Sequence, residues 1–398
     1  MRAERRARTH RTLLILGAVL LLMAAPTTAR GSDEPLVSWP PLVLELGRPD
    51  LTMRLGGRLM IDGSFGLGTD LQFRDPVEVR RGRLFLLLSQ RKHWREKVSV
   101  EFSRSQPRFK DAWIDYRSST KRFGLTIGQF QEPFGLENLT SSKYITFMER
   151  ALPNVMVPRY HLGIGARARG EHWSAAGGVF GGSILNGGLD VGATGWGASG
   201  RLTFSPVHHR DRVLHFGISG LYRAPDARNS LRFRTRPEMD LVDVPRITSR
   251  TMNNVDHWWG LGFEAAAVWG PFSVQGEYIR SDVQRSSGRT NVVADGWYAY
   301  ASWFLTGESR RYRSASGVFG RVKPRRRWGA VELGFRLSRL DFDSPVRRAG
   351  TGNSMTFGIN WYVTSQVRLM ANYVRADVDN RSASSNLDLF GLRFQLDF

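Results

Sequence analysis

Residues 128–150 read GQFQEPFGLENLTSSKYITFMER, and they interrupt a chain that is otherwise built from short alternating segments. The interruption continues to Tyr160, which makes it too long for a tight hairpin turn. Loops longer than about 12–15 residues without structure of their own are uncommon and usually functional. We therefore predict that residues 130–161 form a constriction loop that folds inward and narrows a large β-barrel.

The segments on both sides of this stretch alternate between apolar and polar residues. Near the C-terminus, Met355, Phe357 and Ile359 alternate with Thr356 and Gly358. Successive side chains of a strand point to opposite faces, so each segment has one apolar face. A soluble antiparallel sheet has the same pattern. Alternation alone therefore leaves both a membrane barrel and a soluble sheet open.

Two further features favour the membrane barrel. The chain ends in an alternating strand whose apolar face carries Phe390, Leu392, Phe394, Leu396 and the terminal Phe398. Its end is similar to that of bacterial outer-membrane barrels. The 12 Trp, 10 Tyr and 23 Phe residues often stand at the ends of the alternating segments. Such aromatic girdles mark both interfaces of membrane barrels, whereas in a soluble sandwich these rings would form the core.

The connections between the segments alternate in length. We place strands near residues 51–65, 77–89, 97–105, 109–117, 122–129, 162–170, 172–180, 193–205, 212–223, 257–269, 271–281, 293–305, 328–340, 353–363, 366–377 and 387–398. These sixteen strands are an even number, as in bacterial single-chain barrels, and leave an aqueous channel. With the N-terminus in the periplasm, long connections fall outside the cell and short ones on the periplasmic side. Two connections are exceptions: 106–108 is outside but short, and 306–327 is periplasmic but long. The fold class is therefore all-β, a transmembrane antiparallel barrel over residues 51–398.

The first 29 residues predict export. Five arginines are followed by an apolar run from Leu13 to Ala25 and the small residues Thr27, Thr28 and Ala29, which is typical of a secretory signal peptide over 1–29. Residues 30–50 are Pro-rich and are assigned to an N-terminal periplasmic segment. The absence of cysteine excludes disulfides and thiolate metal sites. We expect the bacterial outer membrane as the location, with outer-membrane lipid as one partner.

The chain has a formal charge of +21, and removal of the signal leaves it strongly basic. In a cytosolic protein this charge would indicate nucleic acid. Behind an export signal it indicates an anionic surface or an anionic solute. Arg232, Arg234 and Arg236 recur every second residue, so an extended backbone puts them on one side, roughly 6.5–7 Å apart. Such a row is either a solvated basic loop or an anion-selecting row in a pore.

Three other basic sets accompany this row. In VEVRRGRL, Arg81 and Arg83 share one face and Arg80 the other, so either the set lies at a strand end or a bulge turns it inward. Around the long loop lie Lys110, Lys143, Arg150 and Arg159. The run from Arg310 to Arg327, which includes Lys323, is either an anion-attracting mouth or a solvated turn.

Together these stretches resemble a known family, the phosphate-selective porins O and P of Gram-negative outer membranes. The resemblance is carried by VEVRRGRL (77–84), KDAWIDY (110–116), residues 128–150, LRFRTRPE (231–238), YASWFLTGESRRY (300–312), GVFGRVKP (317–324) and GINWYV (358–363). It implies a homotrimer of sixteen-stranded barrels in which an arginine ladder leads anions to a central basic site. By this resemblance Arg232, Arg234 and Arg236 form the ladder, Arg80 and Arg81 extend it, and Lys110, Lys143, Arg150 and Lys323 are central-site candidates.

The expected function is therefore passive uptake of phosphate-type oxyanions, with inorganic phosphate or a related anion as the solute. The first alternative is a general anion porin, or one selective for pyrophosphate, polyphosphate or organic anions. An outer-membrane barrel enzyme is a second alternative, although no Ser–His–carboxylate arrangement supports it. A secreted nucleic-acid-binding protein is a third. We expect no enzyme activity, no catalytic residue, no metal, no cofactor and no nucleic acid.

Overall fold

The computed structural model describes residues 42–45, 50–66, 77–103, 106–184, 195–225, 229–240, 245–286, 288–342, 349–380 and 383–398. The predicted signal peptide, residues 1–29, lies outside the described residues, as does most of segment 30–50. No helix in the described ranges is long and apolar enough to cross a membrane.

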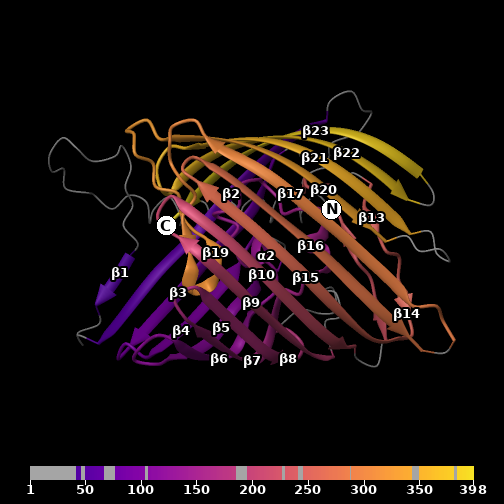
Figure 1. Cartoon of the computed structure of the whole chain (residues 1–398), viewed down its shortest axis with the longest axis horizontal. Helices are drawn as coiled ribbons and strands as arrows, with labels where there is room; N and C mark the ends of the chain where they lie inside the picture. Colours follow the sequence, from indigo (N-terminus) through magenta and orange to yellow (C-terminus); the bar gives the residue numbers. More distant parts are fainter. Residues whose placement is uncertain are drawn as a thin grey trace, which may run out of the picture. The chain divides into compact units, whose positions relative to one another are not determined.

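A single large antiparallel sheet forms the wall of the molecule (Figure 1). Within the described residues it has seventeen strands, and all but β1 close into a barrel, because β23 pairs back onto β2. The barrel strands are β2 (Leu51–Gly66), β3 (Val77–Gln90), β4 (Trp94–Glu101), β5 (Arg108–Arg117), β6 (Phe123–Gln131), β7 (Tyr160–Arg169), β8 (Trp173–Phe180), β9 (Trp196–His208), β10 (Arg212–Ala224), β15 (Val255–Trp269), β16 (Phe272–Arg285), β17 (Val292–Phe304), β20 (Ala330–Asp341), β21 (Gly350–Tyr362), β22 (Val367–Asn380) and β23 (Ala383–Asp397). The predicted sixteen-stranded barrel is confirmed.

The seam of the barrel lies between the first and last long strands. Arg58 is opposite Asp397 there, and Gly66 is opposite Leu389. Beyond the seam, the extra strand β1 (Leu42–Glu45) pairs with residues 52–55 of β2. Part of segment 30–50, which the sequence analysis assigned to a periplasmic N-terminal segment, therefore extends the sheet.

The two faces of each strand differ as the alternation predicted. In β21, Met355, Phe357 and Ile359 are exposed on the outer wall, whereas Thr356 and Asn360 are buried inside the barrel. Apolar side chains on the outside suit lipid contact, since a membrane barrel carries an apolar band on its outer face.

The two ends of the barrel differ in their connections. At one end the strands are joined by tight turns, namely 91–93, 118–122, 170–172, 209–211 and 270–271. Most connections at the other end are longer, although only residues 381–382 separate β22 from β23, and they include the constriction loop between β6 and β7. Because outer-membrane barrels have short periplasmic turns and longer extracellular loops, we call the tight-turn end periplasmic.

The constriction loop folds into the barrel, as predicted. It contains a short helix, α2 (Leu136–Leu139), and a 3-10 helix, η1 (Leu152–Met156), which contacts β16, β17 and β20. The carboxylate of Glu277 on β16 accepts the backbone N–H groups of Leu136 at 2.9 Å and Glu137 at 2.6 Å. These hydrogen bonds hold the start of α2 against the wall.

The long connection at the periplasmic end, residues 305–329, also folds inward. It carries β18 (Tyr312–Arg313), η2 (Ser314–Ser316) and β19 (Val318–Phe319). Phe319 is buried against Leu136 of the constriction loop and Val213 and Val268 of the wall. The predicted placement of 306–327 between two strands at this end is confirmed, and the segment closes part of the lumen.

Apolar side chains fill part of the interior of the barrel. A cluster of buried apolar side chains joins η1, the connection 225–254 and the inner wall of β15 to β23. Its members include Met156, Phe233, Ile279 and Leu389. The two long loops therefore pack on the inner wall and leave the polar lumen to one side.

Candidate functional site

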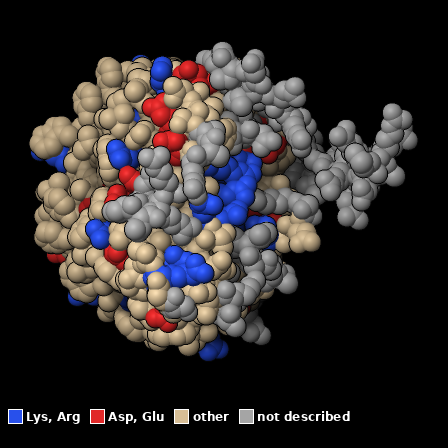
Figure 2. All heavy atoms as spheres, turned by 90° about the vertical axis from the view of Figure 1, so that its right-hand side faces the viewer, with Lys and Arg blue, Asp and Glu red and all other residues tan. Residues whose placement is uncertain are grey.

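A polar cavity of about 520 Å³ lies between the constriction loop and the inner wall of β2 to β5. Its lining is dominated by cations: Arg58, Arg80, Arg81, Arg83, Lys97, Arg108, Lys110, Arg150, Arg159, Arg223 and Arg234. Two acidic residues, Glu101 and Asp111, also line it. Figure 2 views the side on which β14 (Met252–Asn253) lies in Figure 1, and shows Lys and Arg side chains gathered in one patch there. The cavity therefore favours anions.

A bulge in β3 aims two adjacent arginines into the lumen. Along the β2–β3 pair, Met60 is opposite Arg81 and the next residue, Ile61, is opposite Val79, so Arg80 is the extra residue. Arg80 and Arg81 therefore both line the cavity, although alternation would put them on opposite faces. Of the two arrangements that the sequence left open, the structure has the bulge.

Arg80 is engaged by two carboxylates. Its guanidinium makes two hydrogen bonds of 2.8 Å to Glu149 in the constriction loop, and it lies 3.1 Å from Asp240. Glu149 also accepts a 2.7 Å hydrogen bond from Arg393 on β23. Burial disfavours the charged form of Glu149, but Arg80 and Arg393 outweigh it and hold the pKa of this carboxyl well below its ordinary value. Arg80 thus ties the loop to the wall.

Arg81 is less committed than its neighbour. Its closest carboxylate is Glu149, 3.9 Å away, and its Nε has no hydrogen-bond partner among the described residues. The side chain is only 14% exposed. A buried guanidinium with an unused donor is expensive unless a ligand or water accepts from it, so Arg81 is the candidate best placed to meet an anion.

The connection 225–254 carries the three arginines that the sequence predicted as a row, and the structure places them in different surroundings. Leu231 and Phe233 are buried in the apolar cluster, whereas Arg232 and Arg234 on the opposite side are exposed. Arg234 begins β12 (Arg234–Thr235) and lines the cavity. Arg236 is held by an ion pair with Asp240. The row therefore has one member on the cavity, one exposed member and one paired member.

Lys110 lies deeper in the cavity, beside an aromatic ring. Its Nζ is 5.4 Å from the centroid of the Tyr160 ring. The same tyrosine lies 6.0 Å from the Arg83 guanidinium, and Arg83 forms an ion pair of 3.2 Å with Glu101. Rings stabilise nearby cations through their π faces. Tyr160 therefore helps to hold two cations at the cavity wall.

Arg150 lines the cavity but has a structural task. Its guanidinium donates to the backbone carbonyls of Glu137, Asn138 and Thr140 at 2.9–3.1 Å. These carbonyls end the short helix α2, where a cation is favoured. The residue therefore stabilises the constriction loop from the cavity side.

Two predicted site residues lie away from the cavity. Lys143 is buried and pairs with Asp397 at 2.9 Å, and Asp397 also pairs with Arg321 of the segment 305–329. Lys323 lies exposed on that segment and does not line the cavity. The structure thus does not bring these two residues together with Arg80, Arg81, Lys110, Arg150 and Arg234.

Several lining cations were not singled out as site residues from the sequence. Arg58 is one of them: it lies opposite Arg83 across the β2–β3 pair, and its guanidinium donates to Ser142 of the constriction loop at 2.5 Å. Alternation with the buried residues Met60 and Asp62 would have placed it on the inner face. Lys97, Arg108 and Arg223 were likewise missed.

The acids near the cavity are all paired. Asp111 accepts from Lys97 at 2.7 Å and from Ser99 at 2.6 Å. Asp115 lies deeper and pairs with Arg95, Arg117 and Arg167. These ion pairs offset the positive charge only locally, and the cavity stays basic because its lining has more Lys and Arg than Asp and Glu.

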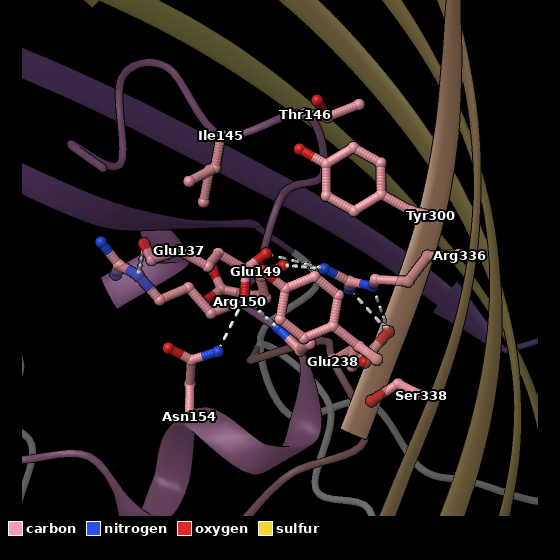
Figure 3. Close-up of polar contacts among 12 residues, drawn as sticks. Glu137, Ile145, Thr146, Glu149, Arg150, Asn154, Glu238, Tyr300, Arg336 and Ser338 are labelled. Carbon is pink, nitrogen blue, oxygen red and sulfur yellow. Dashed lines mark hydrogen bonds and ion pairs between the residues drawn. The ribbon is translucent and has the colours of Figure 1, made fainter. Parts of the chain in front are cut away.

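A buried ion network fixes the constriction loop on the opposite wall (Figure 3). Arg336 on β20 pairs with Glu238 at 2.6 Å, and it donates to Glu137 at 3.4 Å and to the carbonyl oxygen of Glu149 at 3.0 Å. Its guanidinium also lies 4.4 Å from the centroid of the Phe147 ring. One arginine therefore holds two inward loops in a fixed relation to the wall.

Comparisons with known proteins agree with this architecture. A family model described as phosphate-selective porin O and P matches residues 55–398. Porin O of Pseudomonas aeruginosa is 27% identical over an alignment of 428 positions, which covers 97% of each chain. An anion-selective porin from Comamonas acidovorans superimposes with a TM-score of 0.55 at 10% identity, over 88% of this chain and 100% of that one. OprB of Pseudomonas putida gives 0.55 at 11% identity, over 88% and 94%.

Proposed function

Because the chain belongs to the phosphate-selective porin O and P family of bacterial outer-membrane barrels, we propose that its basic cavity conducts phosphate-type oxyanions passively across the outer membrane. The proposal rests on one observation above all, the cluster of Arg and Lys side chains that lines a cavity on one side of the lumen. Rows of Arg and Lys are how anion pores select their ions.

The register of the wall strands orders these cations along the pore. On β3, Arg83 follows Arg81 by two residues and lies about 6.6 Å nearer the periplasmic end. Arg83 faces Arg58 across the strand pair, and Lys97 lies opposite Leu87, four residues further along β3. An anion that enters past Arg234 would thus meet Arg81, then the pair Arg58 and Arg83, and then Lys97.

The mechanism is a stepwise exchange of water for guanidinium hydrogen bonds. Each site must attract the anion enough to dehydrate it in part, yet release it to the next site. Glu101 and Asp111 sit beside Arg83 and Lys97. Their negative charge weakens these two steps, which favours release over trapping.

Phosphate is the preferred solute in this proposal because guanidinium groups match phosphate oxygens in a planar, two-bonded geometry. Most cations of the cavity are arginines rather than lysines. A porin for pyrophosphate, polyphosphate or organic anions uses the same chemistry and is the second candidate. The anion that blocks the channel more strongly distinguishes the two candidates in the test below.

The proposal assigns no chemical step to any residue, so the protein is a channel rather than an enzyme. It also assigns no role to nucleic acid.

We propose that three copies assemble into a homotrimer, as the family resemblance implies. Native mass spectrometry of the detergent-solubilised protein would test this, and a monomer as the main species would contradict it.

The test is single-channel recording of the purified protein in a planar bilayer, in chloride, with phosphate added stepwise. Saturable block of the chloride current at sub-millimolar phosphate is the expected result. Arg81→Ala should weaken the block, because it removes a cavity-lining cation that has an unused donor. Arg375→Ala is the matched control, since Arg375 is exposed on β22, whose odd-numbered side chains face outward.

The outcomes separate the candidates. Phosphate block that Arg81→Ala weakens and Arg375→Ala does not weaken supports the phosphate pathway. Anion preference without phosphate block moves the function to a general anion channel, and stronger block by pyrophosphate moves it to the second candidate. If the protein still shows the heat-dependent gel shift of a folded barrel but conducts no current, the pore function is wrong.

A further inference from the structure

A row of exposed aromatic side chains crosses the outer wall at the periplasmic end of the barrel. Trp269, Phe272 and Trp303 are cross-strand neighbours on β15, β16 and β17, and the rings of Phe272 and Trp303 stack at 5.6 Å. Trp328, two residues before β20, is exposed at the same end. Such rings mark the level at which a barrel meets lipid headgroups.

Two arginines lie against this row on the outside of the barrel. The Arg212 guanidinium is 4.5 Å from the centroid of the Trp269 ring, which is 68% exposed. The Arg326 guanidinium is 5.6 Å from the centroid of the Trp328 ring, which is 50% exposed. Among the described residues, neither arginine forms an ion pair with a carboxylate. Both charges are therefore available at the headgroup level.

An apolar hollow adjoins the row on the same wall. It has a volume of about 520 Å³ and is lined by residues of β10, β15, β16, β17 and β20, most of them on the outward face of their strand. Small residues form its floor, among them Ala265, Gly276 and Ala299. Leu214 and Val274, which also line it, follow Arg212 and Phe272 by two residues, so the hollow begins roughly 6.6 Å from the row.

We propose that this surface is a binding site for one phospholipid of the periplasmic leaflet that carries a net negative headgroup. The headgroup lies at the level of Arg212 and Arg326, and an acyl chain fills the hollow. Cationic side chains near a membrane attract anionic lipids, and Trp rings occupy the interface. Free phosphate has the charge to meet the arginines but nothing to fill an apolar hollow, so the two observations together select a lipid.

This site is separate from the ion pathway, because its residues face away from the lumen. A comparable pair of exposed arginines elsewhere at the periplasmic end provides a control. Arg91 and Arg122 are exposed in the tight turns before Trp94 and Phe123, and neither borders the hollow. Replacing them removes the same charge from the same end of the barrel.

The test is native mass spectrometry of the full-length protein in mild detergent with added phosphatidylglycerol or phosphatidylcholine. Phosphatidylglycerol should be retained preferentially, and the double variant Arg212→Ala/Arg326→Ala should weaken its retention by roughly tenfold or more. Ala299→Trp should also weaken retention, because the indole fills the hollow while both arginines remain. The double variant Arg91→Ala/Arg122→Ala should retain the lipid.

Each other result overturns the proposal. Equal retention of both lipids means that charge does not select the occupant, and retention unchanged by Ala299→Trp means that the hollow takes no chain. Displacement of the lipid by 10-fold excess inorganic phosphate would reassign the arginines to free anions. Phosphate block of the channel, recorded on the same variants, should not change.

Discussion

Arg58 on β2 lies directly opposite Arg83 on β3, and both side chains line the same cavity. Like charges in this arrangement destabilise a sheet unless a counter-charge lies among them. Glu101 pairs with Arg83, whereas Arg58 donates to the neutral hydroxyl of Ser142. The pair therefore holds more positive charge than its protein partners neutralise, which favours an anion between the two strands.

The first prediction concerns this pair. Arg58→Ala should leave the barrel folded and weaken phosphate block of the chloride current by roughly tenfold, since a hydrogen bond to a charged group contributes about 1.5–3 kcal/mol. Titration of single-channel block measures the effect. Block of unchanged strength would show that phosphate does not pass between Arg58 and Arg83.

The second prediction contrasts the two bulge arginines. Arg81→Ala should reduce the preference for anions by the loss of one cation. Arg80→Ala should reduce it more, because it also leaves the negative charges of Glu149 and Asp240 less neutralised beside the lumen. Reversal potentials in a potassium chloride gradient measure both effects.

The double variant Arg80→Ala/Glu149→Gln is the control for this contrast, since it removes one of the released charges. It should recover part of the anion preference that Arg80→Ala loses. Equal effects of the two single substitutions would mean that the carboxylates do not face the permeating ion.

The third prediction concerns the network around Arg336. Glu238→Ala leaves a fully buried guanidinium without its closest carboxylate, and breaking a buried ion pair in this way costs about 3–5 kcal/mol. We expect a lower temperature for the gel shift of the folded barrel and a noisier, wider channel as the loop loosens.

The matched change on the same strand is Arg339→Ala. Arg339 pairs with Asp341 at 3.1 Å on the outer wall and is half exposed. An exposed pair contributes about 0–1 kcal/mol. If the two variants shifted the melting temperature equally, the Arg336 network would not anchor the loop.

The fourth prediction is a pH dependence carried by Glu149. Its pKa is held below the ordinary value against burial by Arg80, Arg393 and Arg81, so its ionised form stabilises the folded barrel. This stability is fully present above the unfolded pKa of about 4.3 and is lost as the pH falls toward the lower folded value. Gel-shift temperatures should therefore be flat from pH 7 to 5 and should fall below pH 4.

Glu149→Gln removes the titrating group and should flatten that part of the profile. A fall in stability between pH 7 and 5 that the Gln variant abolishes would contradict the prediction, since it would place the folded pKa above the unfolded one.

The sequence allowed the barrel to be predicted because alternation is a local signal. The strand from Met355 to Tyr362 shows its two faces without any knowledge of its neighbours, and the constriction loop is visible as a break in the same pattern. The bulge at Arg80 is different, because it depends on the register against β2, and the sequence left two arrangements open.

The site was predictable only in part, for a related reason. Which cations remain available to an anion depends on partners that are distant in sequence. Lys143 looked like a central-site residue, but Asp397 lies 254 positions away in the chain and pairs with it in the fold. Arg58 carried an adequate local signal, its alternation with Met60, and was overlooked.

The one-sided lumen has a consequence for how this protein tolerates change. Phe233, Ile279 and Leu389 lie in the packed half, where a substitution disturbs many contacts at once. Residues such as Arg81 and Lys97 border the open half, where a new side chain meets water. Variation in solute preference can therefore accumulate in β2 to β5 while β15 to β23 keep the barrel intact. In a survey of all single substitutions, those in β15 to β23 should mainly lower the amount of folded barrel. Those in β2 to β5 should mainly change transport.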